Sequence, residues 1–269
     1  MGASMKKLLL ATVSLVALAG SAMAADLPVY KAAPVVAAPG CAQFGGFYVG
    51  GNVGWKYYEN KWHDKDYFGF DNALNAAESD NGWTAGAQVG YNFQWHCTVW
   101  GVVADWNWTN AEASSTYFYD PRFPLDGSLN YNSKEKWYAT LRTRSGIVVD
   151  NLMLYLTGGF AWAKFDRNLV YSYGDAGGIW TQTFSNSKTK LGFVIGAGTE
   201  WAWTQNVSIT SEFLYMGFEK DTPSFTCTPS FCGSYSGTPF RYEFKDSEWV
   251  AKIGVNYRFG GAAPVVARY

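Results

Sequence analysis

The segment "EWVAKIGVNYRF" (Glu248–Phe259) alternates residue by residue between two kinds of side chain. Its odd-numbered positions are apolar or aromatic, whereas Lys252, Asn256 and Arg258 lie among the even-numbered ones. Successive side chains of a β-strand point to opposite faces of the sheet. The alternation therefore predicts a strand with one apolar face and one polar face.

Seven other segments show a similar alternation, and each is long enough for the roughly 9–11 residues that a tilted strand needs to cross a bilayer. They are Phe47–Tyr58, Trp83–Trp95, Val99–Trp108, Trp137–Val149, Leu152–Phe165, Leu191–Trp203 and Val207–Phe218. With the first segment, they predict an all-β protein of eight antiparallel strands.

The connections between these strands alternate in length. Three are very short ("HCT", "DN" and "TQN"), and the other four have about 20 residues or more. The long ones include "YDPRFPLDG" (residues 119–127) and "SYGDAGGIW" (residues 172–180). Short turns at one rim and long polar loops at the other are typical of an up-and-down transmembrane β-barrel with periplasmic turns and extracellular loops.

Alternation alone does not tell a membrane barrel from a soluble barrel, whose apolar face points inward. The strand charges fall on the face that also carries Gly, Asn, Gln and Thr, while Trp and Tyr gather at the ends of the apolar face. Aromatic rings at the ends of an apolar band are expected at the two bilayer interfaces. The pattern thus favours an apolar face turned toward lipid.

Composition agrees with a membrane barrel and excludes some other classes of protein. Charged residues make up 16% of the 269 residues and aromatic residues 18%. A typical soluble domain has about 25% charged residues. The net charge of −1 argues against a nucleic-acid partner, which would need a basic surface.

The N-terminus reads as an export signal over residues 1–24. Lys6 and Lys7 precede a run of about 12 apolar residues, too short to span a bilayer as a helix, and cleavage is expected before Ala25. Residues 25–43 form an Ala/Pro-rich periplasmic linker, residues 44–260 the barrel, and residues 261–269 a periplasmic tail. The hexapeptide "AAPVVA" occurs at residues 32–37 and 262–267, so both copies are expected at the same rim.

Several blocks together carry a family resemblance, among them "FGGFYVGGNVGW", "GWTAGAQVGYNFQW", "VWGVVADW" and "VAKIGVNYRFG". The chain resembles the small outer-membrane β-barrel proteins of α-proteobacteria, the 25/31-kDa surface antigen group of the OmpA-like barrel superfamily. The resemblance implies an outer-membrane location, no cofactor and no catalytic residues. Some relatives are called porins and others bind haem-type ligands, but no motif here transfers either property.

The polar faces of the strands place charged side chains inside the predicted barrel. They are Lys56, Asp105, Arg142, Arg144, Glu200, Glu212, Lys252 and Arg258. A barrel of eight strands has room inside for little more than side chains, and an unpaired buried charge is costly. We expect a salt-bridge core that seals the lumen, with a conduction path or proton relay as the alternative.

Topology selects one pairing of the four cysteines. Cys41 precedes the first strand and Cys97 lies in the turn after the second, so both belong to the periplasmic rim. Cys227 and Cys232 lie together in the last long loop. In an oxidising compartment this predicts the disulfides Cys41–Cys97 and Cys227–Cys232, rather than a zinc site.

No enzyme is expected. The two histidines, His63 in a predicted outer loop and His96 in a tight turn, have no Ser nearby that could complete a nucleophilic site. The loops suit either adhesion or simple closure of the barrel top. We expect a structural protein of the envelope, with a narrow diffusion channel or a surface adhesin or haem-type receptor as alternatives.

The expected partners follow from that location. They are outer-membrane lipid and lipopolysaccharide, and the barrel-assembly machinery, with the cell wall or a host surface as further candidates. Phe259 ends the last strand and is expected to carry the assembly signal, although ten residues follow it.

Overall fold

The computed structural model describes residues 40–65, 75–118, 126–175, 178–226, 228–229, 236–237 and 239–259. Its strands are β1 (Gly46–Asp64), β2 (Asn75–Trp95), β3 (Thr98–Thr109), β4 (Glu112–Phe118), β5 (Asp126–Val149), β6 (Leu152–Asp175), β7 (Gly178–Ala202), β8 (Val207–Phe218), β9 (Ser224–Thr226) and β10 (Pro239–Arg258). The predicted signal peptide, the predicted tail and both "AAPVVA" copies lie outside the described residues. Within the described ranges, no helix combines the length and apolar character needed to cross a bilayer.

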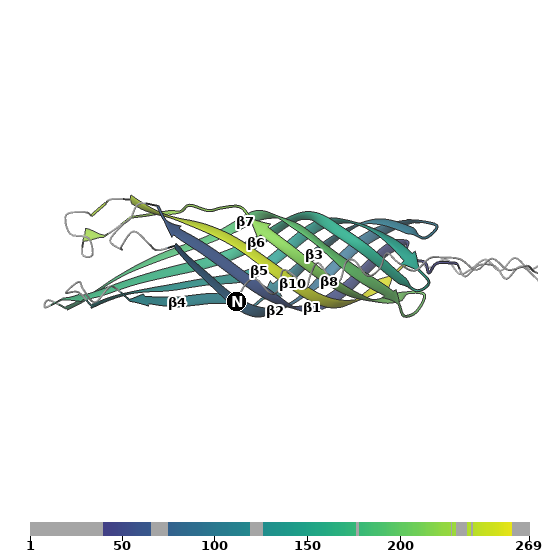
Figure 1. Cartoon of the computed structure of the whole chain (residues 1–269), viewed down its shortest axis with the longest axis horizontal. Coiled ribbons are helices and arrows are strands. Elements are labelled where there is room, and N and C mark those ends of the chain that lie inside the picture. The colour runs from purple at the N-terminus through teal and green to yellow at the C-terminus, as the bar shows by residue number, and fades with distance from the viewer. Residues whose placement is uncertain are drawn as a thin grey trace, which may run out of the picture. The chain divides into compact units, whose positions relative to one another are not determined.

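Eight of these strands form a closed antiparallel ring. Their order is β1-β2-β3-β5-β6-β7-β8-β10, and β10 pairs back with β1 from Tyr48↔Arg258 to Asp64↔Tyr242. Figure 1 shows these strands winding around a common axis with the same tilt. The predicted ring of eight strands is confirmed; β4 and β9 are short additions outside it, on β5 and β10.

The two faces of the ring have the polarity of a membrane barrel. On β1, Val53 and Trp55 point outward and are 55% and 59% exposed, whereas Asn52 and Lys56 point inward and are buried. Large apolar side chains continue this band around the outer face on every strand of the ring. A soluble barrel would have the opposite arrangement.

One end of the ring consists of short turns, and we call it the short-turn end. His96 and Cys97 join β2 to β3, and Asp150 and Asn151 join β5 to β6. His96 and Asp150 have φ values of 54° and 52°, in the left-handed region that His and Asp tolerate better than β-branched residues do. We call the opposite end the long-strand end.

At the long-strand end several strands continue past their predicted limits. The sequence predicts "SYGDAGGIW" (residues 172–180) as part of a long loop, and this is wrong, because β6 runs to Asp175 and β7 begins at Gly178. Beyond the apolar band the polarity of the two faces reverses. Leu169 and Tyr171 are buried inside, and polar residues such as Asn168 face outward. This part of the wall therefore contacts water and no longer resembles a membrane strand in sequence.

The wall at the long-strand end divides into two sheets, which together form what we call the outer extension. The β2–β3 ladder stops at Thr84↔Thr109, and β4 pairs with β5, so β9, β10, β1 and β2 form one sheet and β4, β5, β6 and β7 the other. A mostly aromatic cluster fills the space between them. It contains Trp62, Leu129, Tyr131, Leu169, Tyr171, Phe184, Phe225, Tyr242 and Phe244.

Polar contacts cross both seams between these sheets. At one seam the hydroxyls of Ser115 and Tyr117 on β4 donate to Glu78 on β2. At the other, Lys188 on β7 pairs with Asp221, whose backbone bridges to Phe244 of β10. The outer extension is thus a packed two-sheet unit built on the barrel.

Candidate functional site in the barrel interior

The middle of the barrel holds a four-membered ion cluster. Arg142 on β5 lies 2.7 Å from Asp105 on β3 and 3.1 Å from Glu212 on β8. Lys252 on β10 lies 3.1 Å from Glu212 and 3.6 Å from Asp105. Two cations and two carboxylates thus neutralise one another at this level.

A second group of charges lies nearer the short-turn end. Arg144 Nη1 donates to Glu200 at 2.8 Å, and its Nε donates to the amide oxygen of Asn92 at 2.9 Å. The hydroxyl of Ser208 donates to the other oxygen of Glu200. The guanidinium of Arg144 also lies 4.6 Å from the ring centroid of Tyr48. A cation over an aromatic face gains further stabilisation where water is excluded.

Arg258 is buried in the same region with different partners. Its Nη2 donates to the backbone oxygen of Gln205 at 2.6 Å, and its guanidinium lies 5.4 Å from the ring centroid of Phe44. Within the described residues it forms no ion pair with a carboxylate. Arg258 therefore closes the short-turn end through a carbonyl and a ring.

Toward the long-strand end, Lys56 lies between two carboxylates. It forms ion pairs with Glu135 on β5 and Glu248 on β10, and its ammonium lies 4.6 Å from the ring centroid of Tyr138. The structure thus places all eight charges selected from the sequence inside the barrel wall, each with an exposure of 7% or less.

Glu135 and Glu248 are not among the interior charges predicted from the sequence. Glu248 is an even-numbered position of the same alternating segment as Lys252, so the alternation also indicates that its side chain points inward. The inward position of Glu135 does not follow from the alternation, because the β5–β6 register shifts between Glu135 and Trp137, and this β-bulge changes which positions point inward.

A further missed cluster lies in the outer extension, beyond the apolar band. Asp246 pairs with Arg167 and with Lys190 (2.8 Å), and accepts a hydrogen bond from the Tyr58 hydroxyl at 2.7 Å. Burial alone would raise the pKa of the Asp246 carboxyl, but Arg167 and Lys190 lower it below its ordinary value. The carboxyl therefore stays ionised in a buried position.

These additions change the interior charge balance. The sequence predicts five cations and three carboxylates, whereas the buried charged residues of the described chain comprise seven cations and eight carboxylates. The near balance explains how so many ions can be buried together. An ion crossing the interior would have to break several of these pairs.

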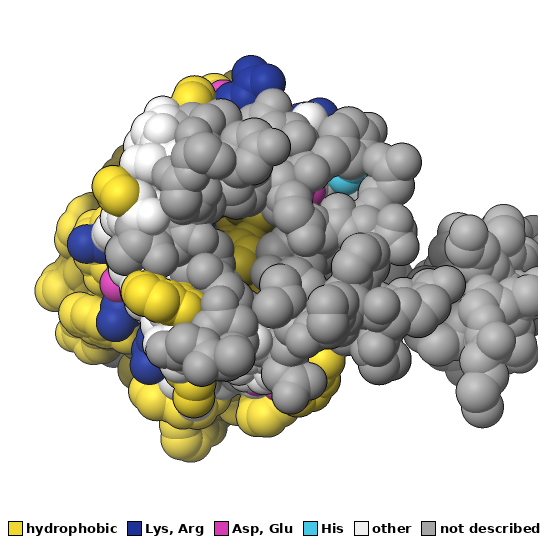
Figure 2. Space-filling view, turned by 90° about the vertical axis from the view of Figure 1, so that its left-hand side faces the viewer, with side chains coloured by type: hydrophobic (Ala, Val, Ile, Leu, Met, Phe, Trp, Pro, Cys, Tyr) yellow, Lys and Arg dark blue, Asp and Glu magenta, His cyan; other side chains and the backbone are white. Residues whose placement is uncertain are grey.

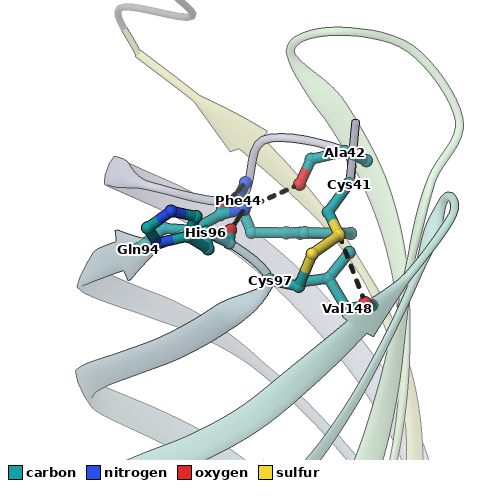
Figure 3. Close-up of a disulfide and its surroundings, with 7 residues drawn as sticks. All are labelled: Cys41, Ala42, Phe44, Gln94, His96, Cys97 and Val148. Carbon is teal, nitrogen blue, oxygen red and sulfur yellow. Dashed lines mark hydrogen bonds between the residues drawn. A yellow bond between two sulfur atoms is a disulfide. The ribbon is translucent and has the colours of Figure 1, made fainter. Parts of the chain in front are cut away.

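The short-turn end is covered by the chain just before β1. The disulfide Cys41–Cys97, predicted from the sequence, is present with a Cα–Cα distance of 5.5 Å, and Figure 3 shows it beside Val148. Residue Phe44 is fully buried, and its backbone N–H donates to the side chain of Gln94 at 2.6 Å. The disulfide therefore holds an N-terminal segment across this mouth of the barrel.

The second predicted cysteine pair and the two histidines lie away from the barrel interior or outside the described residues. Cys227 and Cys232 lie outside the described residues. His96 packs against Trp95 in the β2–β3 turn, and His63 lies on the outer wall opposite Glu243. No group of three or more metal-ligating side chains occurs in the described parts of the chain.

Phe259 directly follows β10. Its backbone N–H donates to the carbonyl of Phe47 at 2.9 Å, and its ring packs against Phe47 on the outer face. The ring is therefore accessible from the lipid side, at the closing seam of the barrel.

Comparison with known proteins agrees with this architecture. The family model described as outer membrane protein beta-barrel domain matches residues 12–259. The 31 kDa outer-membrane immunogenic protein of Brucella melitensis is 32% identical over 222 residues, covering 80% of this chain and 88% of the relative. The 25 kDa outer-membrane immunogenic protein of the same organism is 26% identical over 261 residues, covering 95% and 99%. The crystal structure of OprG from Pseudomonas aeruginosa has a TM-score of 0.50 at 12% identity, covering 81% of this chain and 98% of that one, and is similar in fold alone.

Proposed function

The chain belongs to the outer membrane protein beta-barrel family, and we propose that it is a structural protein of the outer membrane with a sealed lumen. The paired charges of the interior support the proposal most directly. The clusters around Arg144, Arg142 and Lys56 lie at successive levels. Pairs such as Arg142–Glu212, from β5 and β8, and Lys56–Glu135, from β1 and β5, join strands that are not neighbours in the ring. They join the walls of the barrel and leave few charges for a water-filled path.

The N-terminal segment adds a second closure at the short-turn end, which in this family faces the periplasm. Phe44 packs there with Val99, Val148, Met153 and Tyr155. A diffusion channel would instead need a continuous polar opening at this mouth.

Planar-bilayer recording of the purified full-length barrel tests the sealed lumen. We expect no stable, large conductance steps from the wild-type protein. Stable steps that persist at neutral pH would contradict the proposal and favour the narrow diffusion channel.

A gene deletion tested for detergent sensitivity and vesicle shedding examines the envelope role, since an intact envelope in the mutant would argue against it.

One observation favours a second function at the cell surface. The outer extension packs an aromatic cluster between two sheets, including Trp62, Tyr131 and Tyr242, and its strands continue well beyond the apolar band. Two relatives are named outer-membrane immunogenic proteins. We propose that this unit presents loops for contact with a ligand or host surface, and a binding screen of loop deletions on the intact barrel tests it.

A further inference from the structure

A concave basic site lies on the outer wall of the outer extension, between β1, β2 and β10. Its volume is about 270 Å³, and it is lined by Lys61, Lys220, Lys245, His63 and Glu243, with Ala76 and Ala77 at its side. Cationic side chains are visible on the outside of the wall when the molecule is viewed from this end (Figure 2). With three lysines and one glutamate, the site has a net positive charge.

The placement of two of these lysines is unfavourable for the sheet itself. Lys61 and Lys245 are directly paired in the β1–β10 register, and both point outward. Like charges directly opposite each other destabilise a strand pair. The other sheet avoids this, because Lys134 on β5 is directly opposite Asp166 on β6.

The carboxylates nearby do not neutralise the site. Glu243 accepts a hydrogen bond from Lys220 at 2.9 Å and pairs with Lys65 at 3.1 Å, and Lys61 reaches Glu59 at 3.1 Å. Lys245 has no carboxylate partner within the described ranges. An anion from outside the chain would relieve the repulsion between Lys61 and Lys245.

The height of the site identifies the source of that anion. Lys61 lies four residues beyond Tyr57, and Lys245 four residues before Trp249, which are outward aromatic residues of the apolar band on β1 and β10. At about 3.3 Å per residue and a tilt near 40°, four residues rise roughly 10 Å. Lipid headgroups begin at this band, and long lysine stems can reach back toward it.

We propose that this site binds the phosphorylated headgroup of an outer-leaflet lipid, with Lys61, Lys220 and Lys245 as the phosphate contacts. Lysine binds phosphate as a compact point charge, and a phosphate monoester carries nearly two negative charges, which match the net charge of the site. The cavity is smaller than a pocket for a complete drug-sized ligand, so it fits a headgroup fragment whose acyl chains lie against the apolar band.

The test is a binding titration of the detergent-solubilised full-length barrel, followed by native mass spectrometry. The probes are purified lipopolysaccharide, the same lipopolysaccharide after enzymatic dephosphorylation, and inorganic phosphate. The test variant is Lys61→Gln/Lys245→Gln. The matched control is Lys134→Gln/Lys136→Gln, which removes two lysines of the other sheet that are paired with Glu112 and Asp166.

We expect the wild type and the control to bind the phosphorylated lipid with similar affinity. The affinity of the test variant should be lower by about tenfold or more, as for loss of a charge-assisted contact. Dephosphorylation should weaken binding to the wild type similarly. Equal binding by the test variant, or equal binding of the dephosphorylated lipid, would overturn the proposal. Inorganic phosphate binding as tightly as the lipid would also overturn it, because the lipid would then not be the specific ligand. A conducting lumen would leave these results unaffected, so the two proposals fail separately.

Discussion

Arg142 on β5 donates to both carboxylate oxygens of Glu212 on β8, at 3.1 and 3.2 Å, although β6 and β7 separate these two strands in the ring. The contact therefore crosses the interior and joins walls that share no backbone hydrogen bonds. Breaking such a buried pair from one side leaves a carboxylate without its partner, which is strongly destabilising.

Replacing Arg142 with Met should lower the free energy of unfolding by about 3–5 kcal/mol, because Asp105 and Glu212 then share Lys252 alone. Urea unfolding in lipid vesicles, followed by the shift in gel mobility on heating, measures this. The control is Lys134→Met, which removes a surface pair with Glu112 at 40% and 42% exposure and should cost less than about 1 kcal/mol. Similar losses in the two variants would contradict a structural role for the interior cluster.

Removing the disulfide with Cys41→Ser/Cys97→Ser should destabilise the barrel by about 2–4 kcal/mol, since the bridge closes a chain segment with a sequence separation of 56 residues. The N-terminal segment should also leave the short-turn end, and protease should then cut near Phe44. The double variant is preferable to a reductant, which would act on all four cysteines. Unchanged protection of this segment would show that its other contacts suffice to hold it.

The outer extension should loosen in acid through Asp246. Burial acts to raise the pKa of this carboxyl in the folded protein, but Arg167 and Lys190 outweigh that effect and lower the pKa below its ordinary value. Its stabilising contribution is therefore complete above the ordinary value of about 3.9 and is lost as the pH falls through the lower value of the folded state. Hydrogen exchange of residues 239–247 in the wild type should speed up in this acid range before that of residues 249–258.

The variant Asp246→Asn should show the faster exchange already at neutral pH, with a smaller further change in acid. Glu243→Gln, on the outer face of the same strand, serves as its control and should leave the exchange of this segment nearly unchanged. Wild-type and Asp246→Asn profiles that coincide across the pH range would rule out this carboxyl as the source.

Two single-residue deletions in β5 test the role of the bulge at Lys136. Deleting Lys136 removes the bulged residue and keeps Glu135 and Tyr131 inward, so the outer extension should stay protected from protease. Deleting Lys134 instead turns Tyr131 and Leu129 outward, because a shift of one residue exchanges the faces of a strand. In that variant the outer extension should be cleaved while the barrel keeps its heat-dependent gel shift. Equal protection of both deletions would contradict this assignment of faces.

Much of the fold could be predicted because the membrane imposes a simple pattern on each strand. Lipid requires apolar side chains on the outer face, so the alternation along the sequence is enough to assign Trp55 to the outer face and Lys56 to the inner face. The same reasoning placed the eight interior charges on the inward face, and the connection lengths placed Cys41 and Cys97 at one rim.

The outer extension was missed because its surroundings differ. Beyond the apolar band water replaces lipid, so Tyr171 and Phe184 point inward and the polar residues outward, and the segments resemble loops in sequence. The bulge beside Glu135 changes which positions of β5 point inward, so the alternation along this strand does not predict that the Glu135 carboxylate lies inside the barrel.

The strand number, the strand order around the ring and the face of each side chain within the apolar band could be predicted from the sequence alone, because they depend on local alternation and connection length. The three-dimensional structure was needed to show that Arg142 meets Glu212 inside the barrel and that Lys61 faces Lys245 on its outer wall. Those contacts depend on the stagger between strands as the sheet closes. Alternation along a single strand carries no information about that stagger.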